Sequence, residues 1–281
     1  METIQAILMG IMQGLTEFLP ISSSGHLVLV SSIYKVLYGH ELLFTGDQEV
    51  FLDIVLHLGS LLAVFMFFWQ DIVTILREFK KAIITRDFSS PEAKLPIYLV
   101  VGTFFTVLLA FPLKEIVEKT VATPSAVGLF LIMTGFVLLF SENLSSKIKH
   151  DNTITMKKAI IIGLAQGIAA FPGLSRSGMT IAAGLLTGLD RITSARYSFL
   201  LSILVILGTS MVYPLIELSP EQILTFSWKA IAIGFFFSWI VGYFCIKYFL
   251  QFLQKYSLRY FATYCFVVGL FMSIAFHFVK V

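Results

Sequence analysis

Long apolar stretches constrain the fold of this chain more than any other feature of its sequence. A transmembrane helix needs about 20 predominantly apolar residues. Six stretches come close to this length: Phe51–Trp69, Leu95–Leu113, Val121–Phe140, Tyr197–Pro214, Trp228–Ile246 and Tyr260–Phe278. Only 13% of the residues are charged, whereas soluble domains carry about 25%. The sequence therefore predicts an all-α polytopic membrane protein, with residues 1–281 forming a single integral membrane domain.

Two further apolar regions, Ile4–Leu37 and Ala159–Leu189, are interrupted in the middle by Gly, Pro and Ser. Irregular backbone at membrane depth is tolerated only where it is buried in protein or lines a wet cavity. Each region is long enough for two half-helices that enter and leave on the same side, so we predict two re-entrant helix pairs. The start of the chain, METIQAILMGIMQG, has no basic residue and no small-residue cleavage site, so we expect no removable signal peptide.

The two interrupted regions resemble each other. GIMQGLTEFLPISSSG at 10–25 overlies GLAQGIAAFPGLSRSG at 163–178 at a constant offset of 153 residues, with seven identities in sixteen positions. Three predicted spans follow each region, which indicates two repeats at about 1–150 and 151–281. Because three is an odd number, the repeats are predicted to have inverted topology. Paired broken helices at the midplane form the binding sites of inverted-repeat transporters.

The basic residues predict the orientation in the membrane. If the loop after the first span faces the cytoplasm, fourteen Lys and Arg residues lie on the cytoplasmic side and five lie outside, with Arg176 counted on neither side. Such a positive-inside bias is typical of membrane proteins. We therefore expect the first interrupted region to open to the outer face and the second to open to the cytoplasm.

The first interruption gathers several polar side chains. Gln13 and Glu17 are four residues apart, so they share one face of a helix. We expect Pro20 to end this helix and one of the serines at 22–24 to cap the next, with His26 in its first turn. The free N–H groups and partial positive charge of a helix N-terminus favour an anion. The pattern predicts a polar site for a phosphate group.

The second interruption, PGLSRSGMT at 172–180, supplies a positive charge. Gly173 permits a tight turn, Ser175 or Ser177 can cap the following helix, and Arg176 lies between these serines. A lone Arg in the membrane costs about 2.5–3.5 kcal/mol on insertion scales, which indicates an anionic partner. Arg binds phosphate oxygens through two parallel hydrogen bonds.

An ion pair between Glu17 and Arg176 that only locks the two repeats together is the competing interpretation. It leaves the serines and Thr180 unexplained, so we favour the phosphate site. For Asp53 and His57, on the first span, the ordinary interpretation is preferred: they serve packing or the outer rim.

The segments QGLTEFLPISSSGH at 13–26 and PGLSRSGMT at 172–180 resemble the two signature motifs of the undecaprenyl-pyrophosphate phosphatase family, also called bacitracin-resistance proteins. The resemblance covers essentially the whole chain. It implies a hydrolase of the cell membrane that removes the terminal phosphate of undecaprenyl pyrophosphate. The family thereby recycles the carrier lipid for peptidoglycan and other cell-wall polymers, which links it to cell shape and antibiotic resistance.

The resemblance also implies which residues act. The implied catalytic residues are Glu17, Ser23, His26 and Arg176. The implied substrate-binding residues are Gln13, Ser22, Ser24, Gly173, Ser175, Ser177 and Thr180. The family's acidic motif is Glu or Gln, three residues, then Glu, so here it lacks a second carboxylate. The implied cofactor is a divalent cation, Mg²⁺ or Ca²⁺, with Glu17 as its ligand, since Mg²⁺ often uses one carboxylate together with substrate phosphates.

The expected reaction is phosphoryl transfer by positioning and charge neutralisation. Either Ser23 or a water attacks, and either His26 or Glu17 handles the proton. A metal-free phosphohistidine route ranks behind, because the second His and further basic residues of that pattern are not found. A transporter or flippase for polyprenyl phosphate lipids, using the same site, is the alternative function. The expected partners are the polyprenyl pyrophosphate and membrane lipids, with no nucleic acid and with a homodimer left open.

Overall fold

The computed structural model describes residues 2–38, 47–113, 115–117, 123–217 and 226–278. Within these ranges the regular elements are all helices, and no strand occurs. The helices are α1 (Glu2–Thr16), α2 (Ser23–Tyr38), α3 (Asp47–Phe67), α4 (Trp69–Thr85), α5 (Pro91–Ala110), η1 (Phe111–Leu113), α7 (Pro124–Ser145), α8 (Met156–Ile168), α9 (Arg176–Leu186), α10 (Arg191–Glu217), α12 (Trp228–Lys255) and α13 (Arg259–Phe278).

Six of the described helical segments are long and apolar enough to cross a membrane. They are Gln48–Phe67, Pro91–Leu113, Pro124–Ser145, Arg191–Val212, Trp228–Lys255 and Arg259–Phe278. Each overlaps one of the six predicted stretches, so the prediction of a multi-pass, all-α chain is confirmed. The largest difference lies in α12, which continues past the predicted end at Ile246 to Lys255. Polar residues lower the hydropathy of this last part without breaking the helix.

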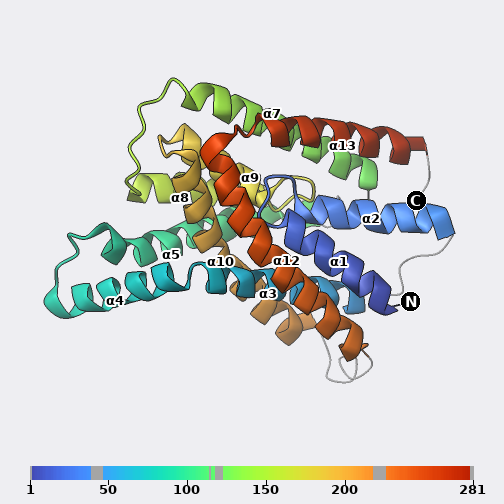
Figure 1. The fold of residues 1–281 in the computed structure, drawn as a ribbon, viewed down its shortest axis with the longest axis horizontal. Helices are drawn as coiled ribbons and strands as arrows, with labels where there is room; N and C mark the ends of the chain where they lie inside the picture. Colours follow the sequence, from blue (N-terminus) through green and yellow to red (C-terminus); the bar gives the residue numbers. More distant parts are fainter. Residues whose placement is uncertain (1, 39–46, 114, 118–122, 218–225, 279–281) are drawn as a thin grey trace.

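The segment after the first span was expected to be a loop, and this was wrong. It forms α4, which starts directly after Phe68 and packs against α5 (Figure 1). Ile75 and Ala82 are buried, while Lys80 and Lys81 are exposed. This is the pattern of an amphipathic helix, which a search for long apolar stretches does not detect.

Both interrupted regions contain two helices joined by a turn: α1 and α2 in the first, α8 and α9 in the second. The end of α1 was predicted at Pro20, but the helix ends four residues earlier, at Thr16. The residue before a proline avoids the helical conformation, and the chain already turns from Glu17, with Ile21 N donating to Leu19 O at 2.8 Å. In Figure 1 the first turn lies in the interior, and α1 and α2 both reach the end of the molecule where the chain begins.

Close backbone contacts hold both interrupted regions in place. A Cβ atom at Gly10 of α1 would lie 2.4 Å from the carbonyl oxygen of Gly234 in α12. A Cβ atom at Gly163 of α8 would lie 2.3 Å from the carbonyl oxygen of Gly102 in α5. Small residues at such crossings let membrane helices approach closely. Each interrupted region is therefore packed against a long helix from the other half of the chain.

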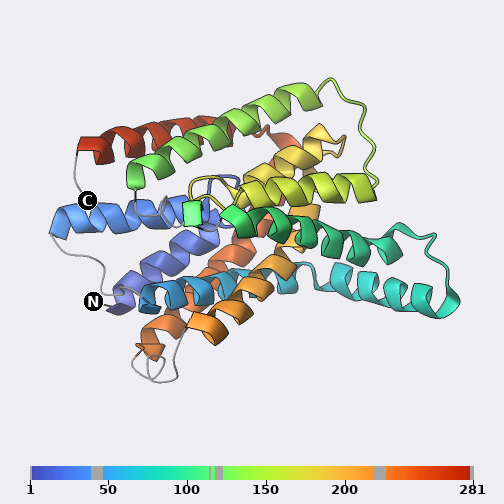
Figure 2. The same cartoon turned by 180° about the vertical axis from the view of Figure 1, so that it is seen from behind.

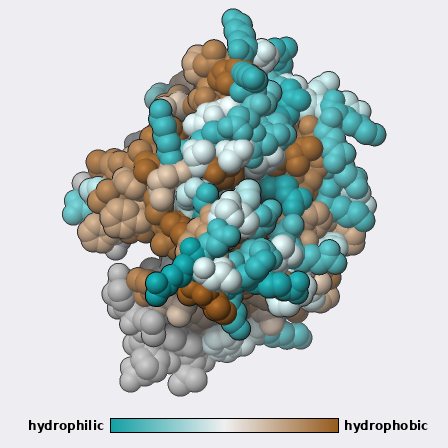
Figure 3. Space-filling view, turned by 90° about the vertical axis from the view of Figure 1, so that its left-hand side faces the viewer, coloured by the Kyte–Doolittle hydropathy of each residue, from teal (hydrophilic) through white to brown (hydrophobic). Residues whose placement is uncertain are grey.

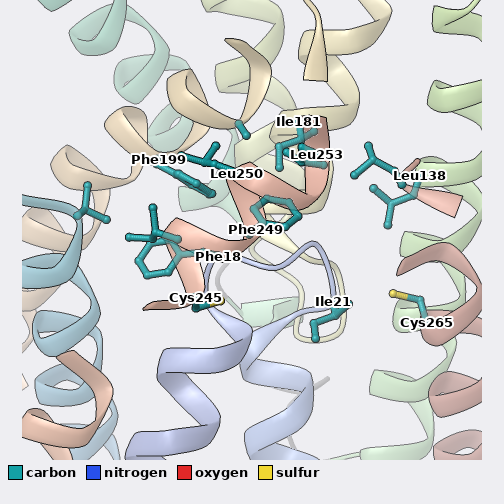
Figure 4. Close-up of a cluster of buried hydrophobic side chains, with 14 of the residues drawn as sticks. Phe18, Ile21, Leu138, Ile181, Phe199, Cys245, Phe249, Leu250, Leu253 and Cys265 are labelled. Carbon is teal, nitrogen blue, oxygen red and sulfur yellow. The ribbon is translucent and has the colours of Figure 1, made fainter. Parts of the chain in front are cut away.

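Buried aromatic residues surround the first turn. Figure 4 shows Phe18, which lies within this turn, beside Phe199 and Phe249. The rings of Phe18 and Phe199 meet edge to face, with their centroids 5.2 Å apart, an arrangement that aromatic pairs prefer. The Cys245 thiol donates to the Leu15 carbonyl oxygen at 3.1 Å, so one of the carbonyls freed at the end of α1 has a partner. The turn is thus part of a packed core.

Hydrophilic residues cover one end of the molecule. Figure 3 looks onto the end at which α4 turns into α5, and hydrophilic side chains dominate this face. α1 begins and α13 finishes at the opposite end, as the front and back views both show (Figures 1 and 2). The exposed basic residues of α4 therefore lie far from the end at which α1 begins and α13 finishes.

Candidate functional site

The carboxylate of Glu17 is the centre of the site. Its side chain is 5% exposed. Its Oε2 atom accepts hydrogen bonds from Gln13 Nε2 at 2.9 Å and from Ser23 Oγ at 2.6 Å. Its Oε1 atom accepts from Arg176 Nη2, which also forms an ion pair with it. Residues from both interrupted regions therefore meet at one carboxylate.

The local sequence explains the first half of this arrangement. Gln13 and Glu17 lie one helical turn apart, so the predicted shared face is confirmed by their hydrogen bond. Ser22 caps α2, because its hydroxyl oxygen accepts from Gly25 N at 3.2 Å. Ser22 has a φ of 68°, a left-handed conformation that reverses the chain. This reversal brings Ser23, the first residue of α2, back to Glu17.

The second half is built in a similar way. Ser175 caps α9 by accepting from Gly178 N at 3.0 Å, and Arg176 is the first residue of that helix. Gly173 has a φ of 95°, and a Cβ atom there would lie 2.2 Å from the Val127 carbonyl oxygen. Only glycine suits this turn, as the sequence predicted.

The two turns share a pattern of serine hydrogen bonds. The hydroxyl oxygens of Ser22 and Ser24 lie 3.3 Å apart, and those of Ser175 and Ser177 lie 3.1 Å apart. These pairs occupy matching positions at the offset of 153 residues. The predicted binding serines are thus engaged in capping and in contacts with one another.

Direct hydrogen bonds also join the two turns. Gly173 N donates to Ser22 Oγ at 3.2 Å, and Ser177 Oγ donates to the Leu19 carbonyl oxygen at 2.8 Å. These bonds are buried or partly buried. Together with the ion pair at Glu17, they make the two turns one structural unit.

Thr180 lies one turn behind Arg176. Its hydroxyl donates to the Arg176 carbonyl oxygen at 2.8 Å and lies 2.6 Å from the Ser198 hydroxyl. Arg176 Nη1 in turn donates to the Ser198 carbonyl oxygen at 3.4 Å. Thr180 and Ser198 therefore fix the helix start that presents Arg176. No motif or spacing in the sequence indicated a role for Ser198.

The ring nitrogens of His26 contact groups other than the Glu17 carboxylate. Its Nδ1 atom is 2.7 Å from the Ser22 carbonyl oxygen, and its Nε2 atom is 2.7 Å from the Tyr264 hydroxyl. The ring is stacked on Tyr264 and the residue is only 2% exposed. Tyr264 comes from α13, 238 residues along the chain, so no local pattern could indicate it.

His57 contacts the site although the sequence assigned it, with Asp53, to packing or the outer rim. Its Nε2 atom lies 3.5 Å from Glu17 Oε2, and its Nδ1 atom lies 3.5 Å from Asp53 Oδ1. Two ionisable residues one turn apart inside a membrane helix were the missed signal, because such residues are usually functional.

The oxygen atoms at the site suit a hard divalent cation. Besides the Glu17 carboxylate, Gln13 Oε1 and Asp53 Oδ1 are buried without a hydrogen-bond partner. Mg²⁺ and Ca²⁺ prefer such oxygen ligands, and Mg²⁺ takes few of them from the protein. Among the described residues no cluster of three or more His, Cys, Asp or Glu side chains could hold a metal by itself. Substrate oxygens would have to complete the coordination.

These features define a class: a polytopic membrane protein in which two interrupted helical regions meet at a buried Glu17–Arg176 ion pair. The sequence profile described as "Bacitracin resistance protein BacA" matches residues 6–271. The chain belongs to this family.

Curated relatives are similar over nearly their whole length. The chain is 41% identical to an undecaprenyl-diphosphatase of Halothermothrix orenii, over 98% of each chain. It is 38% identical to the protein of the same name from Methanosphaera stadtmanae, and 39% identical to that from Methanobrevibacter smithii, over 96% of each chain.

Proposed function

We propose that this chain is an undecaprenyl-diphosphatase, which hydrolyses undecaprenyl pyrophosphate to undecaprenyl phosphate and inorganic phosphate. The names of its full-length relatives support this assignment. The observation that carries it is the Glu17 carboxylate, held between Ser23 and Arg176 of different turns. An ion pair that only locked the fold would not need a serine hydroxyl at 2.6 Å from the same carboxylate.

Arg176 is the residue that binds the phosphate. Its side chain is 18% exposed at the meeting point of the turns. A pyrophosphate that reaches it competes with Glu17 for the guanidinium, which bonds phosphate oxygens strongly because both partners are charged. Binding therefore transfers Arg176 from the carboxylate to the substrate.

Ser23 is the nucleophile in this proposal, and it attacks the terminal phosphorus. A nucleophile and its base lie within hydrogen-bond reach of each other, as Ser23 Oγ and Glu17 Oε2 do. Ser23 Oγ forms a bond to the terminal phosphorus, the bond from phosphorus to the bridging oxygen breaks, and undecaprenyl phosphate leaves. Glu17 takes the serine proton. Water then attacks the phosphorus of the phosphoserine, the bond from phosphorus to Ser23 Oγ breaks, and inorganic phosphate leaves with both water protons. Glu17 returns its proton to Ser23 Oγ, which restores both residues.

Of the two proton acceptors that the sequence left open, the geometry favours Glu17. Both ring nitrogens of His26 already have partners, on Ser22 and Tyr264. We assign His26 to fixing the start of α2 against α13, where it supports the neighbouring Ser23.

Glu17, with the unpartnered amide oxygen of Gln13, would hold the Mg²⁺ or Ca²⁺ ion that the family implies. When bound, the cation neutralises the charge of the pyrophosphate. The protein's own share of that neutralisation comes from Arg176.

The architecture proposed with this function is two inverted repeats, each with one re-entrant helix pair and three transmembrane helices. The matched serine caps support it, as does the crossed packing of α1 on α12 and of α8 on α5. The fourteen-to-five distribution of basic residues supports a site that opens to the outer face of the cell membrane.

The test is phosphate release from a polyprenyl pyrophosphate by the purified protein in detergent. We expect turnover by the native chain and its loss in Glu17→Ala, Ser23→Ala and Arg176→Ala, with a partial loss in His26→Ala. No phosphate above background would refute hydrolysis and favour the flippase alternative. Normal turnover in Ser23→Ala would instead identify water as the nucleophile.

A further inference from the structure

His57 and Asp53 of α3 remain outside the mechanism described so far. Ionisable side chains within a membrane helix are costly and rare, yet these two lie one turn apart. The His57 Nδ1 atom is within hydrogen-bond distance of the Asp53 carbonyl oxygen, at 2.8 Å, and makes a longer charge contact of 3.5 Å with Asp53 Oδ1. This leaves the Nε2 atom directed at Glu17.

The backbone of α3 is fixed at this level. The Ser238 hydroxyl of α12 donates to the Leu56 carbonyl oxygen at 2.7 Å. A Cβ atom at Gly59 would lie 2.6 Å from the Phe235 carbonyl oxygen, so α3 and α12 touch through their backbones. His57 therefore projects from a part of α3 whose backbone is held against α12.

The contact between His57 and Glu17 is not needed to balance the buried charge, because Arg176 already forms an ion pair with Glu17. During the proposed reaction Arg176 turns to the substrate phosphate. The carboxylate then loses its strongest partner at the moment when it must keep its hydrogen bond to Ser23. His57 faces Oε2, the same oxygen that accepts from Ser23.

We propose that His57, held by Asp53, is a positioning residue that keeps the Glu17 carboxylate aligned with Ser23 when Arg176 binds the phosphate. This inference rests on the proposed function. A base that is oriented by a third group is the usual arrangement for activating a hydroxyl nucleophile. His57 completes such an arrangement from a helix that belongs to neither interrupted region.

The experiment compares turnover and KM for His57→Leu, His57→Gln and, as the matched control, His277→Leu. Leucine fills the space without a donor, whereas the Gln amide nitrogen can take the place of Nε2. His277 is exposed near the end of α13. Misplacing a catalytic group costs up to about 100-fold. We therefore expect kcat of His57→Leu to fall about 10- to 100-fold with KM little changed, and His57→Gln and His277→Leu to remain within about threefold of the native chain.

The melting temperature in detergent separates positioning from folding. We expect His57→Leu to melt within a few degrees of the native protein, and Asp53→Asn to show a smaller loss of kcat. Normal kcat in His57→Leu, with Glu17→Ala inactive, would refute this inference alone. A fall in kcat of His57→Leu that is accompanied by a large fall in its melting temperature would also refute it. So would a stable His57→Gln that turns over as slowly as His57→Leu. Normal turnover in Glu17→Ala would overturn the proposed function and this inference together.

Discussion

Two buried glutamates with arginine partners give a matched test of the site. Glu17 pairs with Arg176, and Glu142 of α7 pairs with Arg191 at the start of α10. Each glutamate side chain is 5% exposed, and each arginine bonds through Nη2. Only the first pair touches a serine hydroxyl at 2.6 Å. The perturbation is therefore Arg176→Ala compared with Arg191→Ala.

The two substitutions should differ in kind. Removing one partner of a buried pair costs about 3–5 kcal/mol of stability, and we expect Arg176→Ala to approach that range. Arg191→Ala should cost less, because the Arg191 side chain is 40% exposed and solvent screens its charge. Loss of one donor to a developing transition-state charge lowers kcat by about 100- to 1,000-fold. This second effect should appear only in Arg176→Ala.

The assay is phosphate release per folded molecule, with the folded fraction taken from size-exclusion chromatography and thermal melting in the same detergent. We expect Arg191→Ala to melt earlier and to turn over at nearly the native rate. Folded Arg176→Ala should turn over about 100- to 1,000-fold more slowly than the native chain. Near-native turnover in folded Arg176→Ala, or an equal loss in folded Arg191→Ala, would refute the assignment of Arg176 to the substrate.

Three further predictions concern the turns, the orientation and the cation. Gly173→Ala should abolish stable expression, because the residue has a positive φ and the new Cβ would clash with backbone. Gly208→Ala, with no atom within 4 Å of the new Cβ, should melt at or above the native temperature. Equal melting temperatures for the two variants would contradict the turn geometry. A cysteine at Ser31 should react with an impermeant thiol reagent in whole cells and one at Lys80 should not, and the opposite result would reverse the proposed orientation. Chelation should reduce phosphate release to near background and added Mg²⁺ should restore it, so unchanged turnover in chelator would exclude a required divalent cation.

Apolar length was enough to predict the fold class. The membrane core excludes water from the backbone, so about 20 apolar residues dictate a helix, and six such helices are present among the described residues. Apolar length does not detect an amphipathic helix, whose apolar residues recur along one face only, so α4 was not predicted. Its buried Ile75 and Ala82 are seven residues apart, a spacing that would have indicated an amphipathic helix.

The site was predictable where its residues are neighbours in sequence. Gln13 with Glu17 and Ser175 with Gly178 follow from helix geometry and capping rules, which depend on spacing alone. The partners of His26 and the approach of His57 depend on how distant helices pack. No spacing along the chain indicates that Tyr264 faces His26.

The matched serine caps show that the two turns are built in nearly the same way. The residues that differ between them make the two turns chemically unequal. At the offset of 153 residues, Ser23 corresponds to Arg176, and Glu17 corresponds to Ala170. In the proposed mechanism the nucleophile and its base thus belong to one turn, and the arginine that binds the phosphate belongs to the other. Two turns of similar backbone therefore carry different chemical groups, and exchanging Ser23 and Arg176 would place the serine in the turn that has Ala170 where the other has Glu17.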